Sequence, residues 1–138
     1  MPSIFSKIIA GQIPCYKVAE NANCFAFLDI NPLMEGHTLV VPKKELDELF
    51  EMDDETYHQL MQFTKQVAKA IKQAVLCKRV TSLVLGFEVP HAHVHLIPAH
   101  HEREINFANP KKHFTKEEFE ATAKKIAQSF DTLFKVSS

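Results

Sequence analysis

The sequence of 138 residues is poor in glycine and cysteine and has no excess of charge. It holds three glycines, three cysteines and no tryptophan, and its 16 basic and 17 acidic residues give a net charge of −1. A balanced charge offers no general basic surface for nucleic acid. No apolar run is long enough to cross a bilayer, and no secretory signal is recognisable, so we expect a cytoplasmic protein that binds neither nucleic acid nor membrane. The odd number of widely spaced cysteines indicates reduced thiols.

The length suits one domain that spans residues 1–138. Apolar alternation predicts strands over residues 15–20, 24–30, 37–41 and 80–85, and a fifth strand through a histidine-rich stretch. Helical spacing predicts a short helix over residues 3–11, a long helix over 53–76 and a C-terminal helix. The expected class is α+β, with about five antiparallel strands and both longer helices packed on the sheet.

The C-terminal helix has the clearest start signal. Thr115 and Glu118 match a capping box, and Phe114 and Phe119 match a hydrophobic staple. Helical spacing also predicts the apolar stripes of the two longer helices. In the long helix the predicted stripe is Tyr57, Leu60, Met61, Thr64, Val67, Ala68, Ile71, Ala74 and Val75. In the C-terminal helix it is Phe119, Ala123, Ile126, Phe130 and Leu133.

The most unusual stretch, residues 89–98, holds His91, His93 and His95 at every second position. Side chains at i, i+2 and i+4 of a strand share one face. As a strand, this stretch would present a row of imidazoles spaced by about 6.5–7 Å. The residues between them would enter the core from the other face: Ala92, Val94 and Leu96.

Two chemical uses explain such a row. The first is a metal, because a His-x-His pair on a strand can bind zinc. Further ligands could come from residues that lack diagnostic spacing: His37, Glu88, His100, His101 and Glu102. The second is covalent catalysis, in which the central imidazole attacks phosphorus and its neighbours hold charge and move protons. Three histidines on one face favour the second use, and the spacing alone leaves both open.

The remaining histidines have ordinary interpretations. His58 and His113 are expected on the surface, and His100 and His101 in a solvated loop. His37 is interpreted as a polar residue at the start of a strand.

Residues 91–97 resemble the histidine triad motif, His-φ-His-φ-His-φ-φ, in which φ is apolar. The segments 4–14, 27–32 and 36–43 resemble the N-terminal helix and two nucleotide-side strands of the same family, so the resemblance covers about residues 4–98. It implies the family fold, a homodimer in which two sheets join, and no cofactor. It also implies a hydrolase acting at the α-phosphate of nucleotides, typically purine nucleoside phosphoramidates.

Carried over by position, the resemblance makes His93 the nucleophile and His91 and His95 its supports. Val89 would offer its backbone N–H to the phosphate, and Asp29 would accept hydrogen bonds from the ribose. Glu88 stands on the phosphate side, where some members have a hydroxyl. The walls of the base pocket would be Ile4, Phe5, Ile8, Phe27, Ile30 and Leu39. For Phe27 and Leu39, a plain core position is an equally good interpretation.

This sequence departs from the family pattern in several places. Many members have a Cys-x-x-Cys pair where this chain has Ser3 and Ser6, and a histidine where it has Glu45. Without thiolates, no structural zinc is expected. A glutamine common in the family is replaced by Phe87, and residues 79–84 replace an Asn-rich turn. These changes favour an amine leaving group over a polyphosphate. Alternatives are a dinucleoside polyphosphate hydrolase, or a nucleotide-binding regulatory or scaffold protein with weak chemistry.

Overall fold

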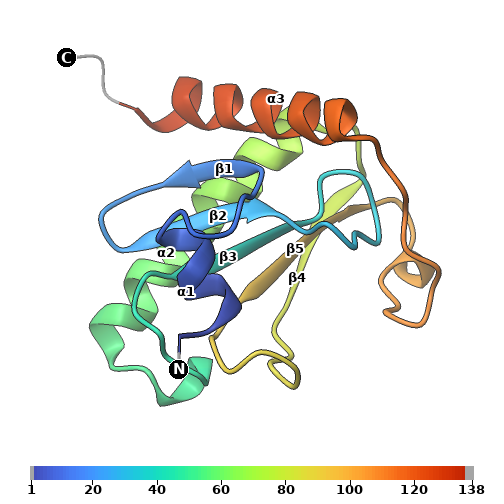
Figure 1. The fold of residues 1–138 in the computed structure, drawn as a ribbon. Helices are drawn as coiled ribbons and strands as arrows, with labels where there is room; N and C mark the ends of the chain where they lie inside the picture. The colour runs from blue at the N-terminus through green and yellow to red at the C-terminus, as the bar shows by residue number, and fades with distance from the viewer. Residues whose placement is uncertain (1, 136–138) are drawn as a thin grey trace.

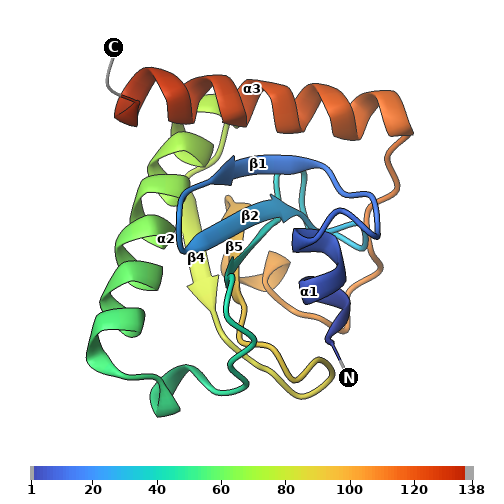
Figure 2. The same cartoon turned by 60° about the vertical axis from the view of Figure 1, so that its left-hand side comes forward.

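The computed structural model describes residues 2–135, which form a five-stranded antiparallel sheet with helices on both faces (Figures 1 and 2). The spatial order is β1-β2-β3-β5-β4. The strands are β1 (Lys17–Glu20), β2 (Cys24–Leu28), β3 (Thr38–Pro42), β4 (Arg79–Leu83) and β5 (Val94–Ala99). The first three form an antiparallel meander, and β5 then pairs with both β3 and β4.

The helices are α1 (Ile4–Ile9), α2 (Asp54–Ala74) and α3 (Lys116–Phe134), with short 3-10 turns at Leu49–Glu51 and Glu102–Glu104. Their ends follow the local sequence signals. The Asp53 carboxylate caps α2, and Thr115 and Glu118 form the predicted capping box of α3. Gly11, with φ of +79°, follows the end of α1. Within residues 2–135, no helix has the length and hydropathy needed to cross a membrane.

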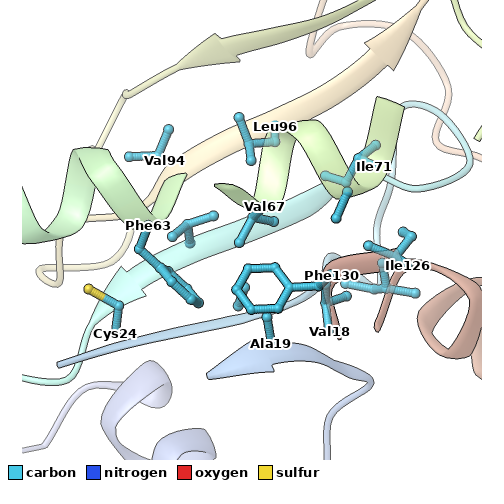
Figure 3. Packing of buried hydrophobic residues seen from close by; sticks show 14 of the residues in the cluster. Val18, Ala19, Cys24, Phe63, Val67, Ile71, Val94, Leu96, Ile126 and Phe130 are labelled. Atoms are coloured by element: carbon cyan, nitrogen blue, oxygen red, sulfur yellow. The ribbon is translucent and has the colours of Figure 1, made fainter. Parts of the chain in front are cut away.

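The main core fills the space between α2, α3 and one face of the sheet (Figure 3). Phe63 of α2 is 1% exposed within this core, and its ring centroid lies 5.7 Å from that of Phe130 of α3. The apolar stripe predicted for α2 omitted Phe63, although this side chain belongs to the core. The prediction for Leu133 was wrong, because this side chain is 42% exposed and Phe134 packs on the core instead. Helical spacing is ambiguous between such neighbours near a helix end.

The other face of the sheet carries α1 and a smaller apolar cluster. Because side chains alternate along a strand, Cys24 and Ala26 of β2 enter the main core, whereas Phe25 and Phe27 point to the α1 side. The buried members of this second cluster are Phe5, Phe25, Phe27, Leu39 and Val41. In Figure 2, α1 and α2 lie on opposite sides of the sheet.

The strand predicted through all three histidines is only partly observed. β5 begins at Val94, so His95 belongs to it, whereas His91 and His93 lie in the preceding segment. The ladder with β3 reaches only to the Val40–Val94 pair. Before this pair, the Ala92 N–H donates to the carbonyl of Leu46, a residue that follows β3. The prediction of the core-facing residues is confirmed, since Ala92, Val94 and Leu96 are all buried.

Candidate active site

His93 lies just before β5, and its ring contacts the rings of Phe5 and His95. Its ring centroid is 4.9 Å from that of Phe5 on α1 and 5.1 Å from that of His95, both in edge-to-face geometry. The Nδ1 atom lies 2.8 Å from the backbone carbonyl oxygen of His91. Because a carbonyl only accepts hydrogen bonds, Nδ1 carries the proton. In the neutral ring, Nε2 therefore holds the lone pair that a nucleophile requires.

The Nε2 atom of His93 is also reachable from outside. It makes no hydrogen bond to any residue between 2 and 135, yet every buried side-chain nitrogen and oxygen in that range has a partner. His93 Nε2 must therefore retain exposed surface, although the side chain as a whole is buried. Nε2 of His95 meets the same two conditions. Two adjacent imidazoles thus present free nitrogens.

His95 is held by a second buried histidine, His37, which lies at the start of β3. The Leu33 N–H donates to Nδ1 of His37 at 3.0 Å, so the proton of neutral His37 lies on Nε2. This Nε2 lies 3.0 Å from Nδ1 of His95 and donates to it. Neutral His95 then carries its own proton on Nε2, facing outward as a donor. His93 and His95 therefore offer opposite properties, a lone pair and an N–H.

Burial keeps this pair of histidines neutral. It lowers the pKa of His37 to about 4, against the opposing effect of the Asp29 carboxylate. Burial, and then the neighbouring rings of His37 and His93, lower the pKa of His95 to about 3. Desolvation disfavours a charged imidazole, so both rings are neutral at pH 7 and the tautomers follow from their hydrogen bonds. The ring of Phe107 covers the pair, with its centroid 5.0 Å from that of His95.

The backbone before His37 is fixed by Gly36. Its φ is +91°, a conformation that L side chains rarely adopt. A Cβ there would lie 3.1 Å from Val75 and 3.2 Å from Pro98. The turn into β3 therefore needs glycine, and it places the His37 side chain beside β5.

Asp29 follows β2 and lies next to this pair. One oxygen accepts the Asn31 N–H at 2.8 Å, and the other lies 3.6 Å from Nε2 of His37. Its side chain keeps 18% exposure, so the carboxylate can still accept hydrogen bonds from a ligand. Ligand atoms of Asp29, His37 and His95 lie within 4.8 Å of one another, close enough to bind a metal ion. The hydrogen bond from His37 to His95 already uses the two facing nitrogens.

His91 differs from the other two triad members because it is completely buried. Its Nε2 donates to the Pro42 carbonyl at 2.8 Å, and its Nδ1 lies 2.7 Å from the Ser3 hydroxyl. Burial lowers its pKa. Both ring nitrogens are occupied by protein groups, so His91 has no ring nitrogen free for a phosphate in this arrangement.

Ser3, Ser6 and Glu45 gather where many relatives are expected to bind zinc. The Glu45 carboxylate accepts the Ser3 N–H and the Ser6 hydroxyl, the latter at 2.8 Å. These groups do not fit a thiolate zinc site: the serines offer neutral hydroxyls, and the Ser3 hydroxyl already bonds to Nδ1 of His91. The four side chains are connected by hydrogen bonds to one another.

The apolar residues predicted for a base pocket divide into two groups. Phe5, Phe27 and Leu39 are buried together, and Ile8 packs on them from α1. Ile4 and Ile30 are 49% and 65% exposed and lie outside this cluster. Phe27 and Leu39 are therefore core residues of this face, whereas the side chains of Ile4 and Ile30 are open to solvent.

The residues before the triad lie at the surface. Val89 is half-buried and packs on the small apolar cluster, whereas Glu88 is exposed. Phe87 is 92% exposed. The structure thus places Phe87 and Glu88 at the surface and only Val89 against the site.

Two residues of this site were missed from the sequence. His37 is buried and bonded to His95, and is more than a polar residue at a strand start. Ser3, named from the sequence as a residue that replaces a cysteine of the family pattern, caps α1 and also bonds to His91. The alternation of β3 could have indicated His37, because it shares a face with Leu39, the partner of His95. The surface positions predicted for four other histidines are confirmed, since His58, His100, His101 and His113 are exposed.

Comparison with known proteins identifies the family of this chain. A family model described as the HIT domain matches residues 10–102. Adenosine 5'-monophosphoramidase hnt1 of Schizosaccharomyces pombe is 35% identical over 129 residues, covering 92% of this chain and 97% of the yeast protein. Adenosine 5'-monophosphoramidase HNT1 of Saccharomyces cerevisiae is 39% identical over 101 residues, covering 72% of this chain and 64% of that protein.

A crystal structure of a Hit-like protein involved in cell-cycle regulation from Bartonella henselae has a TM-score of 0.79 and 33% identity. The match covers 92% of this chain and 95% of that one. The α+β fold expected from the resemblance is therefore confirmed. This chain belongs to the histidine triad (HIT) family.

Proposed function

We propose that this protein is a nucleotide hydrolase that cleaves purine nucleoside phosphoramidates at the α-phosphate and releases a nucleoside monophosphate. One observation carries the proposal: His93 has its proton fixed on Nδ1 and a free, accessible lone pair on Nε2. The names of the two yeast relatives, both adenosine 5'-monophosphoramidases, support this substrate class.

In the first step, Nε2 of His93 attacks the α-phosphorus and forms a P–N bond. The bond between phosphorus and the leaving amine breaks, and the amine leaves with the electron pair and takes a proton from water. Charge grows on the phosphate oxygens as the new bond forms. The N–H of His95, fixed outward by His37, is suited to donate a hydrogen bond to one of them.

In the second step, water attacks the same phosphorus and the bond to His93 breaks. Nε2 regains its lone pair, and a proton from the attacking water passes to solvent. The carbonyl of His91 holds the Nδ1 proton throughout, so the ring returns to the state in which it began.

We propose that Asp29 binds the ribose and that the apolar face beside α1 holds the base. The partly exposed carboxylate of Asp29 can accept hydrogen bonds from two hydroxyl groups, and it lies next to His37, which bonds to His95. Phe5 links the apolar face to the nucleophile, because its ring contacts both Phe27 and His93. Exposed Ile4 and Ile30 would become covered when a base binds.

We further propose that the protein is a homodimer joined at the outer edge of β4. β4 ends the sheet on one side, whereas the opposite edge, β1, packs against α3. The segment after β4 exposes Val84, Leu85 and Phe87. An open strand edge followed by exposed apolar side chains is suited to pairing with a second copy. Leu85→Glu should then reduce the mass measured by light scattering from a dimer to a monomer, and a monomeric wild type would contradict this proposal.

The catalytic proposal is tested with adenosine phosphoramidate and purified protein. Wild type should release AMP, and His93→Gly should release at least about 10⁴-fold less while still binding AMP. Equal background release by both proteins would favour a binding protein with weak chemistry. Faster cleavage of dinucleoside polyphosphates than of the phosphoramidate would favour the alternative hydrolase.

A further inference from the structure

The hydrogen bonds around His91 connect the N-terminus of α1 to the nucleophile. The Glu45 carboxylate accepts the Ser3 N–H and the Ser6 hydroxyl. The Ser3 oxygen accepts the Ser6 N–H at 3.0 Å and lies 2.7 Å from Nδ1 of His91. Nε2 of His91 lies 2.8 Å from the Pro42 carbonyl, and the His91 carbonyl lies 2.8 Å from Nδ1 of His93.

The protons in this network can be assigned by elimination. The Pro42 carbonyl only accepts, so Nε2 of His91 carries a proton. Nδ1 of neutral His91 is then a bare acceptor. The Ser3 hydroxyl has two acceptors within reach, Nδ1 of His91 at 2.7 Å and the Ser6 oxygen at 3.4 Å, and the shorter contact assigns its proton to His91. The Ser6 proton is already used, since a carboxylate accepts it. The Ser3 hydroxyl is therefore the one donor within the described residues that holds His91 in this tautomer.

The hydrogen bonds of the His91 ring also hold the backbone carbonyl of His91 in position. His91 is completely buried, with both ring nitrogens bonded to parts of the chain that lie far away in sequence, Ser3 and Pro42. If Nδ1 became protonated instead, Nε2 would face the Pro42 carbonyl as acceptor against acceptor, and the ring would have to move. Its backbone carbonyl, which fixes the proton of His93, lies in the same residue.

We propose that Ser3 is a positioning residue for the nucleophile: it fixes His91, whose carbonyl keeps the proton of His93 on Nδ1 and the lone pair on Nε2. Glu45 supports this role by holding the Ser3 backbone. Ser3 and Glu45 touch no reacting atom, and they act through His91 alone. The inference rests on the proposed function for its effect on rate, but the tautomers can be observed without any turnover.

The direct test is a long-range ¹H–¹⁵N NMR measurement of the histidine ring nitrogens near pH 7. In wild type, the proton should lie on Nε2 in His91 and on Nδ1 in His93. In Ser3→Ala, His93 should populate both tautomers, because its acceptor is no longer fixed. A His93 signal that is identical in Ser3→Ala and wild type would overturn the proposal.

Kinetics supply the second readout. Ser3→Ala should lower kcat about tenfold, an effect typical of a lost buried hydrogen bond, and should leave the affinity for AMP unchanged. Ser3→Thr keeps a hydroxyl at this position and should restore both the tautomer and the rate. If Ser3→Ala does not fold, Glu45→Gln gives the test, because it weakens the support of Ser3 and should shift the tautomers of His93 in the same direction.

Ser6→Ala is the matched control, one turn further along α1. Its hydroxyl donates to Glu45 and does not contact His91, so its effect on kcat should be smaller than that of Ser3→Ala. An equal loss in both variants would show a general effect of α1 and contradict the specific role of Ser3. A wild type with no turnover, combined with a tautomer change in Ser3→Ala, would reject the proposed function and keep the positioning role.

Discussion

The two faces of the sheet are built from the same strands but differ in what they bury. The face toward α2 and α3 buries an apolar core in which Phe63, Ile71 and Ile126 are at most 1% exposed. The face toward α1 has a smaller apolar cluster and, beside it, four buried histidines whose hydrogen bonds fix their tautomers. β5 serves both, since Val94 and Leu96 enter the core while His95 turns to the site.

This difference separates stability from chemistry. Apolar burial is non-directional, so the core face tolerates exchange of one apolar residue for another of similar size. The histidine face depends on the direction of single hydrogen bonds, since a misplaced proton on His93 would remove the lone pair from Nε2. Substitutions in the core should therefore change the free energy of unfolding, and substitutions near the histidines should change kcat.

The largest effect on stability is expected for Phe63→Ala. Removing a buried phenylalanine ring costs about 3–5 kcal/mol, and urea unfolding would measure the loss. The kcat per folded molecule should stay close to that of wild type. Phe50→Ala is the matched control, because Phe50 is 87% exposed and its removal should leave stability unchanged. A large loss of kcat in folded Phe63→Ala would show that the two faces are not separable.

The second largest effect is expected for His37→Asn, on the α1 face of the sheet, and it concerns kcat. Asparagine can still accept the Leu33 N–H, but it does not reach His95 with a donor. We expect kcat to fall about 10²-fold, with little change in AMP affinity. His37→Gln, which places an amide near the Nε2 position, should recover part of the rate. His58→Gln, at an exposed histidine, is the control. Wild-type kcat in His37→Asn would exclude the role of His37 in orienting His95.

Acid should lower the free energy of unfolding, because two buried histidines of the α1 face take up protons when the chain unfolds. In the unfolded chain His37 and His95 have a pKa near 6.5, whereas in the folded chain it is about 4 and about 3. The unfolded state therefore binds more protons between these values, so the free energy of unfolding falls as the pH drops below about 6.5. Urea unfolding between about pH 7 and pH 5 should show this loss. His37→Asn should show a smaller pH dependence, and an unchanged slope would contradict the assignment.

The smallest effect is expected for Thr115→Ala, at the start of α3. It removes the side-chain cap of the helix and should cost about 1 kcal/mol without changing kcat. Thr132→Ala, on an exposed position of the same helix, should cost less. Thermal unfolding of the two variants makes the comparison, and equal melting temperatures would show that the capping box contributes nothing measurable.

What could be predicted from the sequence was mostly local. The capping box at Thr115, the contact of Phe114 with Phe119 and the antiparallel pairing of the first three strands all follow from residues close in the chain. The triad motif identified the family. Its placement wholly within a strand was wrong, because β5 begins at Val94, and before it the Ala92 N–H donates to the Leu46 carbonyl outside the sheet.

The unpredicted part of the site depends on residues far apart in sequence. His37 meets His95 across 58 positions and Ser3 meets His91 across 88. Alternation within β3 indicates the face on which His37 lies, but only the strand register and the return of α1 over the sheet bring the two pairs together. The roles of the site residues, the homodimer and the cytoplasmic location stay predictions.

The stereochemical course at phosphorus tests covalent catalysis by His93 most directly. An adenosine phosphorothioamidate of one configuration at phosphorus would be hydrolysed in ¹⁸O-labelled water, and the configuration of the product would be read by ³¹P NMR. Two successive in-line displacements, first by His93 and then by water, predict overall retention. Overall inversion would mean that water attacks the substrate directly, and it would contradict a nucleotidyl-histidine intermediate.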